Sequence, residues 1–159
     1  MVQVEQHCKA EPKPNIHLKG FRGSASQFFI ASMAKQAHGL HVVVLNDKEN
    51  AAYALNDLQD LLGEDKVLFF PSPFKYPYKQ ESVDNTNVLM RAETLDRIVK
   101  KPSWMVVVTY GEALSEKVVT KKQLKKNILE LKVEEEISID FINELLYEYH
   151  FERVDFVTG

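Results

Sequence analysis

Short runs of apolar, mostly β-branched residues alternate with segments of helical periodicity over residues 15–115. The clearest runs are 41–45, 67–70 and 104–109, and each is as apolar as a strand covered on both faces. A weaker run, 16–19, precedes the first helical segment. Each of the three connections is long enough to hold a helix. The sequence therefore predicts an α/β fold, a four-stranded parallel sheet with flanking helices.

Three helices are predicted between these runs. The first begins at Ser24, because Ser24 and Gln27 have the spacing of a capping box. The second can be capped by Asn46 or Asp47. The third begins near Asn85 and carries Val88, Ala92, Leu95 and Val99 on one face. Ligands of such sheets bind at the carboxyl ends of the strands, so any site is expected there.

The segment from Gly20 to Gln27 has the outline of a degenerate P-loop. A working loop reads G-x-x-x-x-G-K-[ST], in which the lysine reaches the phosphates and the hydroxyl ligates Mg²⁺. Aligned from Gly20, this chain has Ala25, Ser26 and Gln27 at the last three positions. We expect no ATP hydrolysis, no bound cofactor and no catalytic residue here. The vestigial loop comprises Gly20, Gly23, Ser24, Ala25, Ser26 and Gln27.

Two interpretations of this loop remain. The favoured one is a strand-to-helix turn that binds nothing. In the other, Gly23, Ser24 and the first helical N–H groups still hold an anion weakly.

Composition excludes several classes of protein. The 159 residues carry a net charge of −3, which gives no general attraction to nucleic acid. Cys8 is the single cysteine, so no intrachain disulfide can form and a cytoplasmic location is expected. No apolar run approaches the roughly 20 residues of a membrane span. The histidines have no metal-ligand spacing except His38 and His41 at i, i+3, and no metal site is expected there. Residues 1–14 are expected to be a flexible leader.

Lysines crowd residues 116–126, which we interpret as a basic connector. Such a run could follow a DNA backbone. However, the nearby carboxylates of Glu112, Glu116 and Glu130 offset the positive charge of the lysines, so solvated surface is the favoured interpretation. The candidate nucleic-acid contacts are Lys117, Lys121, Lys122, Lys125 and Lys126.

Residues 127–159 are predicted to begin a second, truncated α+β domain. Residues 128–133 alternate with period two, as in a half-exposed strand. Ser138 precedes a helix with an apolar face, and 153–157 begin a further strand. This unit is too small to bury its own apolar surface.

Taken together and in order, four segments resemble the N-terminal region of bacterial transcription-repair coupling factors (Mfd), whose first modules are similar to the excision-repair protein UvrB. They are residues 20–27, residues 69–78, residues 91–95 followed by 105–109, and residues 131–137 with 149–155. UvrB keeps the lysine that Ser26 replaces here. UvrB also has a long β-hairpin for which residues 79–86 leave no room, so the coupling factors are the closer match.

The resemblance implies a UvrB-like domain at residues 15–115 and the opening of the UvrA-binding domain at 127–159. It implies a non-catalytic fragment that serves transcription-coupled nucleotide excision repair. UvrA recruitment would need the complete second domain. RNA polymerase, double-stranded DNA, ATP and Mg²⁺ would be bound by other modules of a longer protein.

Two other functions remain open from the sequence. One is a P-loop-type nucleotide-binding enzyme with unorthodox residues, although no aspartate follows the apolar run at 106–108. The other is a DNA-binding module that acts through residues 117–126.

Overall fold

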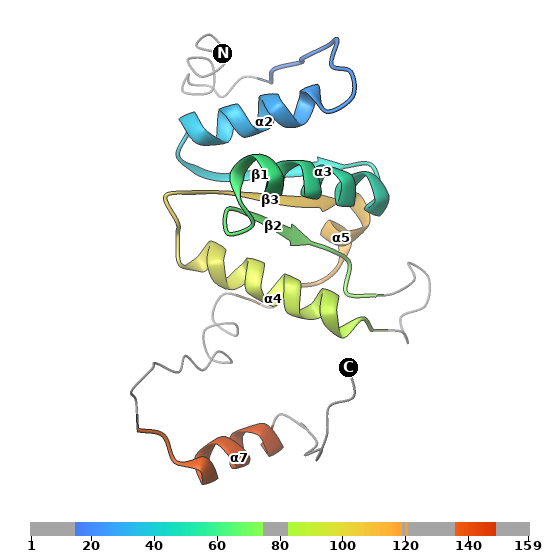
Figure 1. Ribbon diagram of the computed structural model, residues 1–159. Coiled ribbons are helices and arrows are strands. Elements are labelled where there is room, and N and C mark those ends of the chain that lie inside the picture. The colour runs from blue at the N-terminus through green and yellow to red at the C-terminus, as the bar shows by residue number, and fades with distance from the viewer. Residues whose placement is uncertain (1–14, 75–82, 119, 121–135, 149–159) are drawn as a thin grey trace. The chain divides into compact units, whose positions relative to one another are not determined.

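The computed structural model describes residues 15–74, 83–118, 120 and 136–148 (Figure 1). The chain divides into two units, Met1–Lys126 and Asn127–Gly159, which we describe separately. The predicted boundaries at residues 14, 115 and 126 stay predictions.

A parallel three-stranded sheet forms the centre of the first unit. Its strands are β1 (Gly39–Leu45), β2 (Val67–Phe70) and β3 (Trp104–Tyr110), in the order β1-β3-β2. Gly39 pairs with Trp104, and Val67 pairs with Val106. The predicted α/β fold is confirmed.

The predicted strand at residues 16–19 is wrong, because these residues have no regular structure. Ile16 and Leu18 remain 40% and 38% exposed. His17 and Lys19 alternate with them, so this short segment offers little apolar surface to offset the cost of ordering it. Both edges of the central strand β3 are already taken by β1 and β2.

Helices cover both faces of the sheet. They are α2 (Ala25–Gln36), α3 (Lys48–Leu62), α4 (Asn85–Val99) and the short α5 (Gly111–Ser115). Side chains from α2 and α3 pack on one face of β3 with Val106 and Val108. Leu95 and Ile98 of α4 pack with Met105 and Val107, which point to the opposite face because strand side chains alternate.

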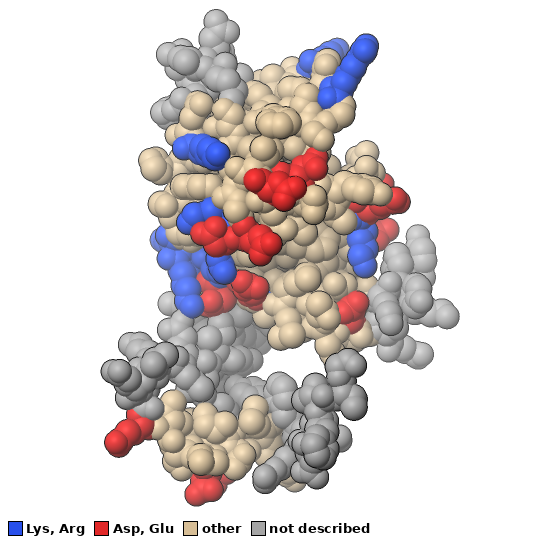
Figure 2. All heavy atoms as spheres, viewed as in Figure 1, with Lys and Arg blue, Asp and Glu red and all other residues tan. Residues whose placement is uncertain are grey.

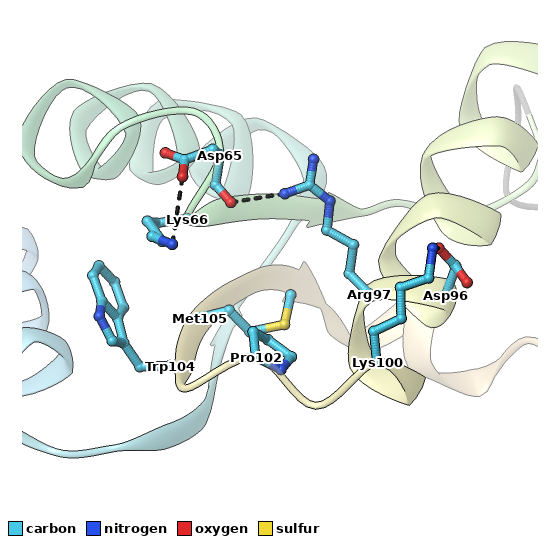
Figure 3. A pocket seen from close by; sticks show the side chains of 8 residues that line it. All are labelled: Asp65, Lys66, Asp96, Arg97, Lys100, Pro102, Trp104 and Met105. Atoms are coloured by element: carbon cyan, nitrogen blue, oxygen red, sulfur yellow. Dashed lines mark hydrogen bonds and ion pairs between the residues drawn. The ribbon is translucent and has the colours of Figure 1, made fainter. Parts of the chain in front are cut away.

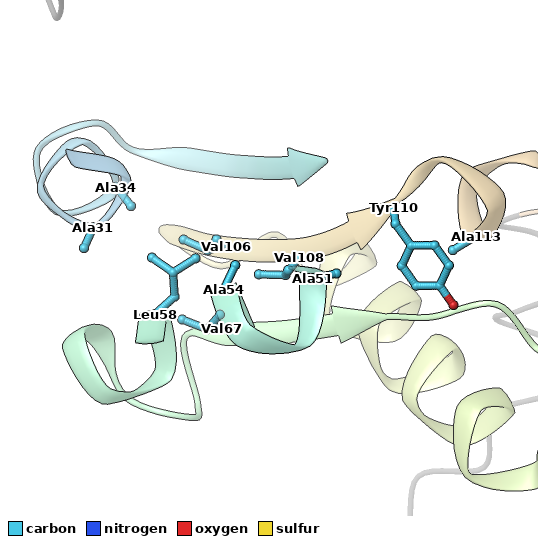
Figure 4. Packing of buried hydrophobic residues seen from close by; sticks show 10 residues of the cluster. All are labelled: Ala31, Ala34, Ala51, Ala54, Leu58, Val67, Val106, Val108, Tyr110 and Ala113. Atoms are coloured by element: carbon cyan, nitrogen blue, oxygen red, sulfur yellow. The ribbon is translucent and has the colours of Figure 1, made fainter. Parts of the chain in front are cut away.

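The larger core cluster lies between α2, α3 and the sheet (Figure 4). Small residues allow close packing, since Ala34 and Ala51 are fully buried against the larger Leu58, Val106 and Val108. Figure 4 shows Tyr110 at the carboxyl end of β3, beside Ala113.

The predicted N-terminal cap of α3 is confirmed, whereas that of α2 is wrong. Asp47 caps α3, with its Oδ1 accepting from the Asn50 N–H at 2.8 Å. This bond also lowers the pKa of the Asp47 carboxyl below its ordinary value. The predicted capping box of α2 is wrong, because the Ser24 side chain makes no capping bond. Instead the Ser26 hydroxyl donates to Oε1 of Gln27 at 2.7 Å.

Strand β1 is half exposed, although the sequence predicts a strand covered on both faces. Leu40, Val42 and Val44 are 46%, 52% and 54% exposed. They share a sheet face with Met105 and Val107, which α4 covers. Because α4 packs against β2 and β3, its cover does not extend to β1.

In the second unit, the predicted helix is confirmed as α7 (Ile139–Glu148). The Ile142 N–H donates to the Ser138 carbonyl at 3.2 Å, which begins the helix. The strands predicted at 128–133 and 153–157 lie outside the described residues. None of the helices among the described residues has the length and apolar character that a bilayer crossing requires.

Candidate functional site

The vestigial loop is exposed and keeps a turn. Gly20 and Gly23 have φ values of 91° and 54°, a conformation that favours glycine. The Ala25 N–H donates to the Arg22 carbonyl at 3.2 Å, which closes the turn just before α2. However, no strand leads into it. No hydrogen bond or ion pair between described residues joins this loop to the strand ends.

The carboxyl ends of β2 and β3 carry a buried polar network. The phenolic oxygen of Tyr110, at the end of β3, accepts from the N–H of Ser72 in the segment after β2, at 2.9 Å. The Ser72 carbonyl accepts from Nδ2 of Asn87, also at 2.9 Å. Ser72, Asn87 and Tyr110 are all buried. Burial raises the pKa of Tyr110 above its ordinary value.

Arg91 joins the segments that follow β2 and β3. Its Nη1 donates to the Pro71 carbonyl at 2.7 Å and to the Ala113 carbonyl at 3.1 Å. The guanidinium carbon lies 4.0 Å from the centroid of the Phe70 ring. Arg91 is only 6% exposed, and burial lowers its pKa. Its Nη2 is buried with no hydrogen-bond partner in the described part of the chain.

Helix α4 extends this network along β2. The Thr94 hydroxyl shares its one proton between the Phe69 carbonyl at 3.0 Å and the Met90 carbonyl of its own helix at 2.8 Å. Arg97 Nη1 donates to the Asp65 carbonyl at 2.9 Å. With Asn87 and Arg91, these residues are spaced i, i+4, i+7 and i+10, which places them on one side of the helix. Helix α4 therefore meets the edge of β2 through polar side chains.

This polar row corrects the predicted packing of α4. The sequence places Val88, Ala92, Leu95 and Val99 on one apolar face, the side of a helix that ordinarily packs on the core. Leu95 does pack on the core, but Val88 is 40% exposed and Ala92 is exposed as well. The missed signal is the regular recurrence of polar residues that can donate hydrogen bonds.

A pocket of about 280 Å³ lies at the amino ends of β2 and β3 (Figure 3). Lys66 is 5.6 Å from the centroid of the Trp104 ring and 3.4 Å from an Asp65 carboxylate oxygen. Two further lining cations are also paired: Lys100 Nζ is 2.9 Å from Asp96 Oδ2, and Arg97 Nη2 is 3.1 Å from Glu93 Oε1. The pocket therefore concentrates little unpaired positive charge.

Of the five lysines predicted as nucleic-acid contacts, the structure describes one. Lys117 is exposed, whereas Lys121, Lys122, Lys125 and Lys126 lie outside the described residues. Figure 2 shows basic and acidic side chains interspersed on the first unit. In the part of the chain that the structure describes, no three His, Cys, Asp or Glu side chains are grouped to hold a metal ion.

No family model matches the chain, and no solved structure matches it. Curated proteins do. UvrABC system protein B of Borreliella burgdorferi is 28% identical in an alignment of 149 positions that covers 86% of this chain. The transcription-repair-coupling factors of Rickettsia typhi and Rickettsia bellii are 27% and 29% identical over 135 residues, or 84% of this chain.

The chain spans 22% of the length of the first relative and 12% of the two coupling factors. The predicted resemblance is confirmed: over most of its length the chain is similar to transcription-repair-coupling factors and to protein B of the UvrABC system.

Proposed function

We propose that this chain is a non-catalytic region of a DNA-repair protein, and that it serves as a scaffold in transcription-coupled nucleotide excision repair. The similarity to both kinds of repair protein supports a repair role. One observation carries the non-catalytic assignment: Ser26 and Gln27 stand where a phosphate loop needs its lysine and its hydroxyl.

The residues present do not fit ATP and Mg²⁺. Serine supplies no positive charge to the β- and γ-phosphates, and a glutamine amide is a weak substitute for the metal-binding hydroxyl. No compensating aspartate stands at the end of β3, because Thr109 and Tyr110 follow its apolar run at residues 106–108. We therefore assign no step of ATP hydrolysis to this chain.

The proposed partners follow from the repair assignment. UvrA recruitment would need the complete second domain, of which residues 127–159 would be the opening. Contacts with RNA polymerase and double-stranded DNA would come from other modules of a longer protein, as would ATP and Mg²⁺ binding. Such a protein would act in the cytoplasm.

A pull-down with purified UvrA tests this proposal. We expect this chain alone to retain no UvrA, and a version extended through a complete second domain to retain it. The control is the extended version carrying a charge reversal of exposed Glu64 (Glu64→Lys), which lies in the first unit and should leave retention unchanged. Failure of the extended version to retain UvrA would remove the recruitment role.

A further inference from the structure

The backbone edge of β2 is closed by side chains. The Val106 N–H donates to the Lys66 carbonyl at 2.9 Å, so the alternate carbonyls on either side of Lys66 point away from β3. Each of these outward carbonyls, and that of Pro71 beyond them, accepts a side-chain hydrogen bond. The pairs are Arg97 with Asp65, Gln59 with Val67, Thr94 with Phe69 and Arg91 with Pro71.

The outer edge of β1 has no strand paired to it in the part of the chain that the structure describes. The Gly39 N–H donates to the Ser103 carbonyl at 2.8 Å, so Gly39 faces β3 and the alternation turns Leu40, Val42 and Val44 outward. No described residue donates a side-chain hydrogen bond to these three residues or accepts one from them. The strand contains no charged residue and no proline, the usual features that keep an edge from pairing.

The same three residues form an exposed aliphatic row. Leu40, Val42 and Val44 are 46%, 52% and 54% exposed, whereas their neighbours Met105 and Val107 on the same sheet face are 3% and 4% exposed. An unpaired edge and uncovered aliphatic side chains therefore coincide on one strand.

From this coincidence we infer that β1 pairs with β1 of a second copy of this chain, antiparallel and with Val42 on the two-fold axis. Val42 then exchanges both backbone hydrogen bonds with its counterpart, and Leu40 does so with Val44 of the other copy. The two aliphatic rows meet on one face, where cross-strand apolar pairs stabilise the contact. The two sheets become one continuous sheet.

Charge favours this antiparallel arrangement over a parallel one. Lys35 and exposed His38 lie before β1, and Asp47 and Glu49 follow it. A two-fold axis at Val42 brings the basic end of one strand to the acidic end of the other, and Lys48 is the one opposing charge there. A parallel pairing would bring like ends together.

The contact is small. Seven residues of strand extend over roughly 23 Å, and one strand edge with three aliphatic side chains buries less than the standard interface of about 800 Å² per partner. We therefore expect a weak dimer that forms in the micromolar range.

Sedimentation equilibrium of the whole chain at roughly 10 to 500 µM, a range that brackets micromolar dissociation constants, tests this pairing. We expect a concentration-dependent dimer. Val42→Lys should weaken dimerisation by about tenfold or more, because it places like charges together on the axis. The matched control, Val42→Thr, keeps a β-branched side chain and should remain dimeric. A chain that stays monomeric throughout this range would overturn the inference, and so would a folded Val42→Lys variant that dimerises as strongly as the unsubstituted chain.

Amide hydrogen exchange of the unsubstituted chain shows whether β1 forms the dimer contact, even if the lysine variant does not fold. The N–H groups of Leu40, Val42 and Val44 should gain protection as the protein concentration rises. Those of Val67 and Phe69 on the other edge should not change. Dimerisation without added protection at the three β1 amides would place the contact elsewhere and overturn the inference.

Discussion

Replacing Arg91 by methionine is expected to lower the free energy of unfolding by about 3 kcal/mol. The guanidinium donates to the carbonyls of Pro71 and Ala113, and methionine leaves both without that donor in a buried site. Methionine retains an apolar stem of similar length, so lost packing contributes little. The unpartnered Nη2 already costs some stability, which keeps the expected effect from being larger.

Urea unfolding followed by the fluorescence of Trp104, the single tryptophan, measures this change within the first unit. The control is Arg22→Met at an exposed arginine, which should change the free energy of unfolding by less than about 0.5 kcal/mol. An Arg91→Met variant as stable as the unsubstituted chain would show that the two carbonyls do not depend on this side chain.

Tyr110→Phe is expected to cost about 2 kcal/mol at neutral pH. It removes the hydroxyl that accepts from the Ser72 N–H and leaves that amide buried without its partner. The phenyl ring keeps the core contacts. Tyr53→Phe is the matched control, because Tyr53 is 67% exposed and its hydroxyl contributes little to the fold.

The stability difference between the unsubstituted chain and Tyr110→Phe should depend on pH, because the pKa of Tyr110 is raised in the folded protein. The unfolded phenol ionises near its ordinary pKa of about 10, whereas the folded one resists ionisation. The contribution of Tyr110 to stability is therefore complete below pH 10 and is lost as the pH rises toward and through the folded pKa. The difference between the unsubstituted chain and Tyr110→Phe should narrow above about pH 10. A difference that stays constant up to about pH 11 would contradict this assignment.

The elements that local sequence determines were predicted well. The β-branched runs of β1 and β3 and the apolar β2 appear near the expected bounds, and Asp47 caps α3 as one of two candidates. These signals depend on residues a few positions apart, so the sequence alone reveals them.

Apart from the capping box of α2, which is a local signal that failed, the errors discussed here concern long-range contacts. Whether β1 is covered depends on where α4 packs, and α4 is separated from β1 by many residues. The polar row of Asn87, Arg91 and Thr94 was missed because polar residues on a helix ordinarily face solvent. Here their partners are backbone carbonyls of the segment after β2 and its edge. The strand order places β2 at the edge of the sheet, and this order is what shows that its outward carbonyls need side-chain donors.

The candidate site was predicted less well than the fold. The vestigial loop keeps its turn at Gly20 and Gly23 but lacks the strand that the phosphate-loop comparison requires in front of it. The network around Arg91 and Tyr110 carried no sequence motif. It occupies the strand ends where ligands of parallel sheets gather, and its hydrogen bonds go to the backbone of the chain itself.

Calorimetric titration of this chain with ATP and Mg²⁺, together with an assay for released phosphate, tests whether the Gly20 loop is inactive. We expect no binding heat, no phosphate release and no change on Ser26→Ala. Phosphate release by the purified chain that Ser26→Ala abolishes would show that the loop at Gly20 hydrolyses ATP without the lysine and hydroxyl of a working phosphate loop, and the non-catalytic assignment would then be wrong.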